Sequence, residues 1–181
     1  MFYIFLADGF EEVEALTPLD LMRRAKIEVQ TVGVTGRYVT GSHNITVKAD
    51  LCIEELDKTN CDAVMLPGGM PGTTNLYNCE KVLECVTKCA NENKLVCAIC
   101  AAPLILGRLG LLEGKAAVCF PGFEDELKGA EIVNMPCVTQ ENIITAKGAG
   151  AVFEFSKAII TYLKDEKTAV SILETIQCSH M

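Results

Sequence analysis

The chain has 181 residues, 50% of them hydrophobic, and a formal net charge of −8 at pH 7. This length is enough for one domain with a continuous core. The negative charge, with no cluster of lysine or arginine, argues against a nucleic-acid partner. No apolar run reaches the roughly 20 residues that a membrane-spanning helix needs, so we expect no contact with a membrane.

The two ends and the cysteines predict where the protein works. The first apolar run, Met1–Ala7, meets an acidic block rather than a small-residue cleavage site, which favours a cytoplasmic location. The ten cysteines are scattered through apolar segments, so we expect reduced thiols. Ser179-His180-Met181 has the composition of a cloning remnant, so the predicted single domain covers residues 1–178.

Short apolar strands alternate with helical patterns along the chain. The predicted strands are Phe2–Ala7, Glu28–Val34, Ala63–Leu66, Leu95–Ile99, Ala116–Phe120 and Ile143–Ala146. The predicted helices are Glu11–Arg24, Glu80–Glu92, Pro103–Leu109, Val152–Lys164 and Lys167–Thr175, and Thr35–Ile53 has the pattern of a hairpin. This alternation predicts an α/β fold, with a mainly parallel sheet covered by helices on both faces.

A cysteine lies at one junction between strand and helix. The apolar strand Leu95–Ile99 runs into Cys100, and two alanines follow before a helix begins at Pro103. The pattern is typical of a nucleophile elbow, which aims a side chain out of the carboxyl edge of the sheet. Backbone N–H groups at a helix start favour a thiolate there. A buried cysteine at a strand end explains the same pattern equally well.

Three acids open the helix after the first strand: Glu11, Glu12 and Glu14. Helical spacing places Glu11 and Glu14 on one side and Glu12 on another, so at most one or two face the sheet edge near Cys100. Acids are favoured at helix N-termini without any further role, and we expect two of the three to face solvent. A remaining carboxyl at the sheet edge would hold a proton and hydrogen-bond the sulfur.

The run Leu66-Pro67-Gly68-Gly69 follows another predicted strand. Its glycines allow positive φ and a close backbone approach to a bound group. Together with the N–H of Ala101, this run would form an oxyanion hole. An ordinary glycine turn is the alternative interpretation.

Six motifs occur in order along almost the whole chain. They are Asp8-Gly9-Phe10-Glu11-Glu12-Val13-Glu14, Pro18-Leu19-Asp20, Met22-Arg23-Arg24-Ala25, Leu66-Pro67-Gly68-Gly69, Ala98-Ile99-Cys100-Ala101-Ala102-Pro103, and Gly148–Gly150 with Phe153-Glu154-Phe155. In these motifs the chain resembles the ThiJ/PfpI superfamily, and most closely its branch containing the parkinsonism-associated deglycase. The resemblance implies a flavodoxin-like three-layer sandwich of the class I glutamine amidotransferase type.

The resemblance also implies roles for matching residues. Cys100 would be the nucleophile, Glu14 the protonated glutamate that hydrogen-bonds it, and the N–H groups of Gly69 and Ala101 the oxyanion donors. The implied activity is the conversion of reactive aldehydes such as methylglyoxal, or of glycated substrates, without a metal or other cofactor, in defence against carbonyl and oxidative stress. The alternative function is a non-catalytic redox sensor or stress chaperone, in which Cys100 is oxidised and Glu14 stabilises the product.

Members of this branch form homodimers through the first helix, which would place Asp20, Arg23 and Arg24 near the contact. Without the resemblance, these charges have the pattern of a solvated helix face. His43 lies in the predicted hairpin, which approaches the partner's active site in relatives. It is therefore an auxiliary candidate, although a surface histidine explains it more simply.

The chain departs from many enzymatic relatives beside the nucleophile. Where they place a histidine before a proline, this chain has Phe120 before Pro121, and its only histidines are His43 and His180. A complete Cys-His-acid relay within one subunit is therefore not expected, and protease or amidase turnover is not predicted. Cys119 is a candidate to resolve an oxidised Cys100.

The remaining cysteines have simpler interpretations. Cys97 and Cys100 form a C-x-x-C, which is a redox pair in some α/β proteins, but core packing of Cys97 is favoured because it lies inside a strand. Cys85 and Cys89 have helical i, i+4 spacing that would suit metal ligands. No histidine or second C-x-x-C supports a metal there, so we predict no metal site.

Overall fold

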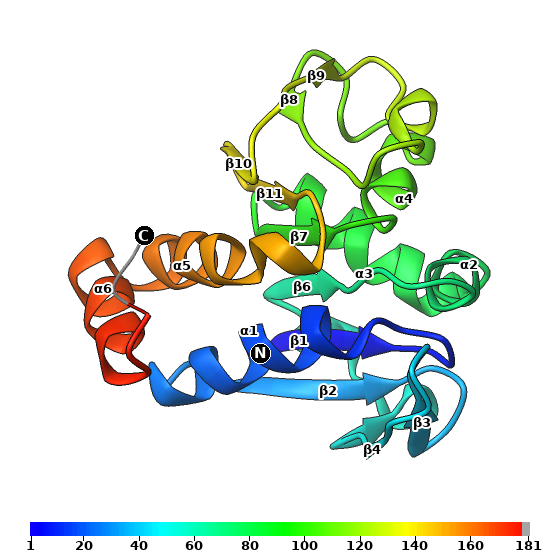
Figure 1. Cartoon of the computed structure of the whole chain (residues 1–181). Helices are drawn as coiled ribbons and strands as arrows, with labels where there is room; N and C mark the ends of the chain where they lie inside the picture. The colour runs from blue at the N-terminus through cyan, green and yellow to red at the C-terminus, as the bar shows by residue number, and fades with distance from the viewer. Residues whose placement is uncertain (179–181) are drawn as a thin grey trace.

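A seven-stranded sheet forms the centre of the computed structural model, which describes residues 1–178 (Figure 1). The strand order is β10-β11-β7-β6-β1-β2-β5. Every neighbouring pair in this sheet is parallel except β10 with β11. The predicted α/β fold with a mainly parallel sheet is confirmed. The cloning remnant proposed at 179–181 lies outside the described residues.

The elements have the following bounds. The strands of the central sheet are β1 (Phe2–Leu6), β2 (Val29–Gly33), β5 (Leu51–Cys52), β6 (Ala63–Leu66), β7 (Leu95–Ile99), β10 (Cys137–Gln140) and β11 (Ile143–Ala146). Two small sheets pair β3 (Tyr38–Thr40) with β4 (Thr46–Lys48), and β8 (Ala116–Ala117) with β9 (Glu131–Ile132). The α-helices are α1 (Glu12–Arg24), α2 (Gly72–Tyr77), α3 (Glu80–Asn91), α4 (Pro103–Arg108), α5 (Val152–Leu163) and α6 (Glu166–Thr175). Short 3-10 turns are η1 (Ile53–Glu55), η2 (Lys58–Asn60), η3 (Glu124–Glu126) and η4 (Ala149–Ala151).

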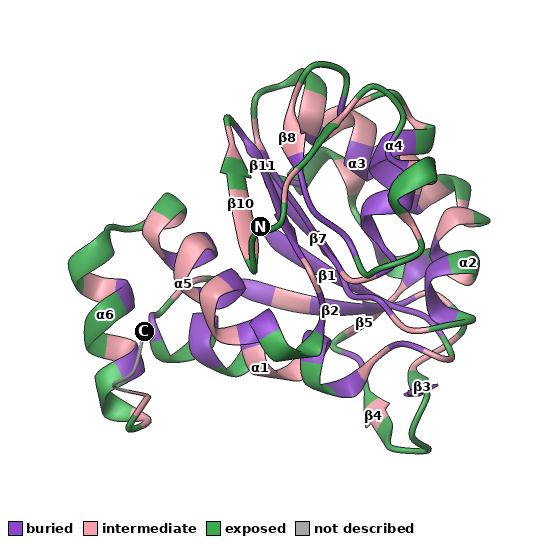
Figure 2. Cartoon of the chain, turned by 45° about the horizontal axis from the view of Figure 1, so that its top comes forward, coloured by how far each residue is buried: buried purple, intermediate pink, exposed green. Residues whose placement is uncertain are grey.

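Helices cover both faces of the sheet and produce two separate cores. Buried side chains of α1, α5 and α6 pack with one face, and those of α2, α3 and α4 pack with the other. Successive side chains of a strand point to opposite faces, so Ile4 joins the first core and Phe5 the second. The central strands are therefore apolar on both sides, as their uniform burial in Figure 2 shows.

Most predicted elements agree with the structure to within one or two residues at each end, but the strand predicted at Ala116–Phe120 is wrong beyond Ala117. The N–H of Val118 donates to Oγ1 of Thr145 at 3.0 Å. The N–H of Phe120 donates to the carbonyl oxygen of Cys100 at 2.8 Å. These N–H groups bond to a side chain and to the carbonyl of a turn, so they are not available to pair with a neighbouring strand. The strand β8 therefore ends at Ala117 and pairs only with β9.

Among the elements that the sequence did not predict are one helix, α2, and one strand of the central sheet, β10. The short helix α2 begins with a glycine and has no side-chain N-cap, so it carries no sequence signal for a helix start. The strand β10 is only partly buried and pairs antiparallel with β11 at the sheet edge. Within residues 1–178, none of the helices combines the length and apolar character that crossing a membrane requires.

Candidate active site

Cys100 lies in the turn that joins β7 to α4. Its φ is 64°, in the left-handed region that side chains other than glycine seldom adopt. Two hydrogen bonds hold this turn: the Cys100 N–H donates to the carbonyl of Ala146 at 2.9 Å, and the Cys100 carbonyl accepts from Phe120 at 2.8 Å. The half-buried cysteine is thus held in a strained elbow at the carboxyl end of a central strand.

Two backbone N–H groups face the Cys100 sulfur. They belong to Ala101 and Gly69, and their hydrogen bonds act to lower the pKa of Cys100. Gly69 has a φ of 87°, and a Cβ there would lie only 2.5 Å from the backbone nitrogen of Glu11. Glycine is therefore required at this position for the loop to approach both α1 and the sulfur. Both N–H groups that were predicted as oxyanion donors thus lie beside the Cys100 sulfur.

Glu14 lies in the first turn of α1 and is 1% exposed. Its Oε2 accepts a hydrogen bond from the N–H of Gly68 at 2.9 Å, and its carboxyl is also hydrogen-bonded with Cys100 and with the backbone of Ala149. A Cβ at Gly68 would lie 2.5 Å from the Cβ of Cys100 and 2.6 Å from Oε2 of Glu14. The absence of a side chain at Gly68 is what lets the carboxyl and the thiol meet. The backbone donors of Gly68 and Ala149 were not predicted, because a backbone donor leaves no residue-type signal.

Glu14 and Cys100 each have a higher pKa in the folded protein than the same group has in water. Burial raises the pKa of Glu14 to about 7; its hydrogen bonds with Cys100 and backbone groups oppose the rise, and the charge of Glu11 adds to it. Burial and the neighbouring charge of Glu14 raise the pKa of Cys100 to about 12. The backbone N–H groups favour the Cys100 thiolate as expected, but burial outweighs them and the pKa of the thiol is raised. The pair instead loses one proton near neutral pH and shares the second.

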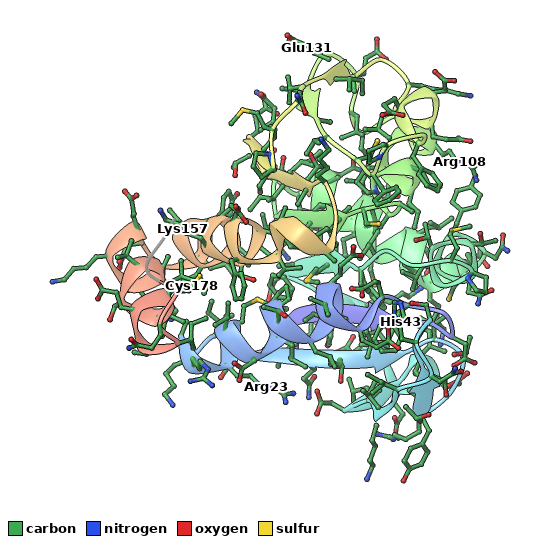
Figure 3. All side chains as sticks on the ribbon, viewed as in Figure 1. Arg23, His43, Arg108, Glu131, Lys157 and Cys178 are labelled. Atoms are coloured by element: carbon green, nitrogen blue, oxygen red, sulfur yellow. The ribbon has the colours of Figure 1, made fainter. Side chains whose placement is uncertain are left out.

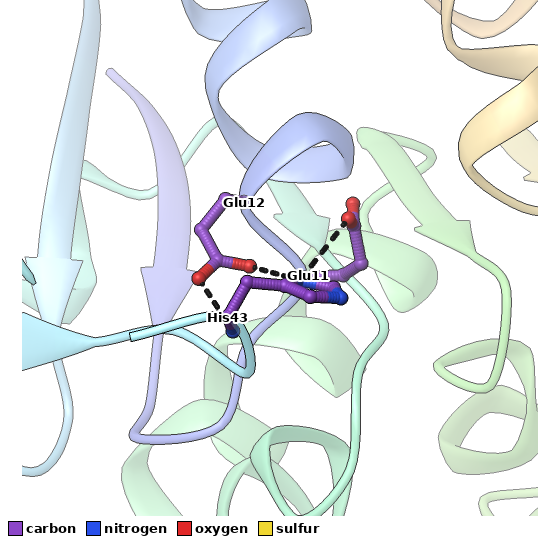
Figure 4. Close-up of side chains that lie close together, drawn as sticks. All are labelled: Glu11, Glu12 and His43. Carbon is purple, nitrogen blue, oxygen red and sulfur yellow. Dashed lines mark hydrogen bonds and ion pairs between the residues drawn. The ribbon is translucent and has the colours of Figure 1, made fainter. Parts of the chain in front are cut away.

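The neighbouring Glu12 is also buried, at 4% exposed, so the expectation that two of the three acids face solvent is wrong. One carboxylate oxygen of Glu12 accepts the backbone N–H of His43 at 2.8 Å, and the other lies 2.9 Å from Nδ1 of the His43 ring (Figure 4). Burial works to raise the pKa of Glu12, but the hydrogen bonds from His43 and Ile45 outweigh it and lower the pKa. Glu12 thus holds the β3–β4 hairpin against α1.

Donor atoms of Glu11, Glu12 and His43 lie within 4.8 Å of one another, a spacing that would suit a metal ion. Oε2 of Glu11 already caps the helix by accepting the N–H of Glu14 at 2.7 Å, and both oxygens of Glu12 accept hydrogen bonds from the hairpin. The N-terminus of a helix also disfavours a cation. We therefore assign these residues to anchoring the hairpin.

The structure does not bring every predicted residue to the pair. The His43 side chain is 69% exposed and contributes to the pKa of neither Glu14 nor Cys100. Cys119 is buried, and burial raises its pKa to about 11. Cys97 is fully buried in β7 among the side chains that pack under α1 and α5.

The charged residues predicted near a dimer contact lie on α1 and are exposed. Nε of Arg24 pairs with Asp20 at 2.7 Å, one helical turn earlier. Arg23 pairs with Asp50 at 2.7 Å, and Figure 3 shows Arg23 pointing outward from α1. Within one chain these three charges are therefore already compensated.

A cavity of about 590 Å³ opens beside the pair. Phe120, Met135 and Gly148 contribute to its largely apolar wall, and Lys147 adds one positive charge. A Cβ placed on Gly148 would lie 3.3 Å from the Phe120 ring and 3.8 Å from Oε1 of Glu14, so this wall reaches the Glu14 carboxyl. By the resemblance, Phe120 stands where many enzymatic relatives have a histidine, and its ring supplies apolar surface without a base.

Comparisons with known proteins agree with this architecture. Residues 2–162 match the model of the DJ-1/PfpI family. A protein named DJ-1 homolog B from Arabidopsis thaliana is 35% identical over 92% of this chain, and the chain spans 39% of that relative's length. A deglycase from Pyrococcus abyssi is 31% identical, with 89% of this chain and 98% of the relative covered. The crystal structure of a cysteine-to-alanine mutant of a DJ-1 superfamily protein from Salmonella typhimurium superposes with a TM-score of 0.91 at 34% identity, over 97% of both chains.

Proposed function

Because the chain belongs to the DJ-1/PfpI family, we propose that Cys100 and Glu14 convert small reactive aldehydes such as methylglyoxal into hydroxy acids. The observation that carries this proposal is the buried Glu14 carboxyl, hydrogen-bonded to the thiol of Cys100 with a pKa of about 7. A pair that shares one proton at neutral pH supplies both a nucleophile and an acid. The name deglycase of the Pyrococcus abyssi relative supports a carbonyl substrate.

The proposed reaction begins when the Cys100 sulfur attacks the aldehyde carbon while the shared proton rests on Glu14. The carbonyl oxygen gains the electron pair of the broken π bond, and the N–H groups of Gly69 and Ala101 stabilise its negative charge. Glu14 then donates its proton to that oxygen and completes a hemithioacetal. This step needs one proton in the pair, which agrees with the two pKa values.

The ionised Glu14 next removes the proton from the carbon that carries the sulfur. The C–H electron pair forms a C=C bond, and the neighbouring carbonyl oxygen takes up the electrons of its π bond and the proton of the adjacent hydroxyl, so that an enediolate forms. Return of a proton to the neighbouring carbon gives the thioester of a hydroxy acid. One carbon is oxidised and its neighbour reduced, so the scheme needs no external oxidant or reductant. Water then hydrolyses the thioester, releasing lactate from methylglyoxal and regenerating the Cys100 thiol.

The deciding experiment measures lactate formation from methylglyoxal by the purified protein, beside Cys100→Ser, Glu14→Ala and His43→Ala. Lactate is the decisive readout, because exposed lysines and cysteines consume methylglyoxal without forming it. We expect the first two variants to lose turnover and His43→Ala to retain it. Absence of lactate with the intact protein would overturn the proposal.

The pH dependence tests the same assignment. Because the active pair has lost one of its two protons, kcat/KM should rise about tenfold per pH unit below about 7 and level off above it. A profile that is flat from pH 5 to 8 would remove Glu14 from the mechanism.

The position of Phe120 favours a second candidate function, a redox sensor. No histidine base stands beside Cys100 in the described residues, while Glu14 is placed to hydrogen-bond an oxidised sulfur. For a sensor, sub-stoichiometric hydrogen peroxide should oxidise Cys100 before the other nine cysteines, as mass spectrometry of tryptic peptides would show. Together with an absence of lactate, that result would select the sensor over the enzyme.

A further inference from the structure

Three cysteines meet in the core at the opposite end of β6 from Gly68 and Gly69. Cys61 precedes β6, and Cys85 and Cys89 lie one turn apart on α3, which packs beside that strand. All three have no exposed surface. The sulfurs of Cys61 and Cys89 are 3.6 Å apart, and Cys61 is also hydrogen-bonded to Cys85. The catalytic scheme uses none of these thiols.

Two lysines, each also ion-paired with a carboxylate, lie beside this dithiol. Nζ of Lys88 donates to the carbonyl of Cys61 at 3.1 Å, and Nζ of Lys94 donates to the same oxygen at 3.4 Å. A hydrogen bond with the Cys61 thiol lowers the pKa of Cys89; burial opposes this effect, while Lys88 and Lys94 add to it. Cys89 is therefore the sulfur that ionises more readily, and Cys61 is the thiol that holds its proton.

We propose that Cys61 and Cys89 are a redox-active dithiol that closes to a disulfide when the protein meets a hydroperoxide. The two residues belong to different elements, 28 positions apart, so the bond would tie the segment after η2 to α3. Sulfur atoms already in van der Waals contact need a movement of about 1.6 Å to reach the usual S–S length of about 2.05 Å. This is a second redox site, separate from Cys100.

The oxidation balances with the hydroperoxide as the only co-reactant. The Cys89 thiolate attacks the outer oxygen; an S–O bond forms, the O–O bond breaks, and the alkoxide or hydroxide that leaves takes up a proton. The Cys61 sulfur then attacks the sulfenic sulfur; an S–S bond forms, the S–O bond breaks, and hydroxide leaves as water with the proton of Cys61. Two thiols lose two electrons, and one hydroperoxide becomes an alcohol or water plus a second water.

A disulfide fits this cluster better than a bound metal. In the part of the chain that the structure describes, the sulfurs of Cys61, Cys85 and Cys89 do not all lie within 4.8 Å of one another. The sulfurs of Cys61 and Cys89, by contrast, are in direct contact, at 3.6 Å. Three thiolates around one soft ion would need all three distances to be short. The geometry therefore favours a pairwise bond.

Burial sets the rate of this reaction. Cys61 caps the end of the short η2 turn, so a peroxide reaches the pair only when that turn opens locally. Oxidation of the pair should be slower than oxidation of the half-buried Cys100. Once formed, the bond would constrain a chain segment of 28 residues and raise the melting temperature by about 5–10 °C.

The test uses hydrogen peroxide on the full chain carrying Cys100→Ser, so that Cys100 does not take part. After thiol blocking under denaturing conditions, a non-reducing tryptic digest separates the peptides 59–81, 82–88 and 89–94, which carry Cys61, Cys85 and Cys89 in turn. We expect a cross-link between 59–81 and 89–94, reversed by dithiothreitol. The fully buried Cys97 is the internal control and should stay reduced.

Peptide 59–81 also contains Cys79, so Cys61→Ser must abolish the cross-link and Cys79→Ser must leave it. Because the first measurement is made with both thiols of the pair present, it does not depend on how these variants fold. A parallel sample of the intact protein shows when the peroxide treatment has oxidised Cys100 completely. Three results would each overturn the proposal: no cross-link at that point, a cross-link to peptide 82–88 instead, or oxidation of Cys97 to the same extent as Cys61 and Cys89.

Discussion

Glu12 and Glu14 lie two residues apart in the first turn of α1, and both are almost fully buried, at 4% and 1% exposed. Burial disfavours the charged form of each. Nevertheless the pKa of Glu12 is lowered, whereas that of Glu14 is raised to about 7. The two carboxyls therefore differ in charge at neutral pH although both side chains are shielded from solvent.

The depth of each carboxyl and its hydrogen-bond partners together explain the difference, because Glu14 lies deeper in the protein than Glu12. Glu12 accepts hydrogen bonds from the backbone and ring of His43 and from the backbone of Ile45, and His43 adds positive charge when protonated. Glu14 has the backbone donors of Gly68 and Ala149, but the thiol of Cys100 and the negative charge of Glu11 are also beside it. Burial depth and the number of hydrogen-bond donors together decide whether a glutamate at this helix start stays ionised or holds a transferable proton.

The largest effect should come from Glu14→Gln, which keeps the shape of the side chain but removes its transferable proton. Turnover of methylglyoxal to lactate should fall by about 10²–10⁴-fold, the usual contribution of a general acid or base. Steady-state assays of lactate formation measure this fall. The matched change Glu12→Gln should cost less than about tenfold; equal losses in the two variants would show that both glutamates act only on the fold.

The second effect concerns stability. The pKa of Glu14 is raised from 4.5 to about 7, so its protonated form stabilises the fold fully below pH 4.5, and this contribution is lost as pH rises through 7. The shift corresponds to about 3 kcal/mol. Urea unfolding of the intact protein and of Glu14→Gln at pH 5 and pH 8 isolates most of this effect. Because part of it is already lost at pH 5, the intact protein should lose about 2–3 kcal/mol more than the variant between the two pH values. A parallel loss in both would contradict the raised pKa.

The third effect has the opposite pH dependence. Because the pKa of Glu12 is lowered, its contribution is present above pH 4.5 and is lost as pH falls through the lowered value. Glu12→Gln replaces hydrogen bonds to a charged acceptor by weaker neutral ones, which should destabilise the protein by about 1.5–3 kcal/mol at pH 7. Thermal unfolding followed by circular dichroism measures the cost, which should shrink toward pH 3 rather than grow.

The smallest effect should come from His43→Gln. The hydrogen bond with Glu12 raises the pKa of His43, so the ion pair is complete below pH 6.5 and is lost as pH rises through the raised value. Since the ring is exposed and does not act on Cys100, lactate formation should change by no more than about twofold. Hydrogen exchange should quicken in the β3–β4 hairpin alone; a large loss of turnover would instead place His43 in the catalytic mechanism.

Local pattern in the sequence determined the fold class, most element bounds and the cysteine elbow. Alternating apolar runs are sufficient to predict strands buried on both faces, and the short turn at Cys100-Ala101-Ala102 is a local feature. The resemblance in six motifs added Glu14 as the partner of Cys100. The strand predicted through Phe120 failed because its backbone donors are taken by Thr145 and Cys100, which are distant in sequence.

Only the tertiary structure decided how each side chain ionises. The sequence contains three adjacent acids but does not show that Glu12 meets His43 or that a bare Gly68 brings Glu14 to Cys100. Nor does it show that Cys61 contacts Cys89 rather than staying an isolated core residue. The physical reason is common to these cases: pKa values and thiol pairing depend on burial and on neighbours brought together through space, whereas secondary structure depends chiefly on neighbours along the chain.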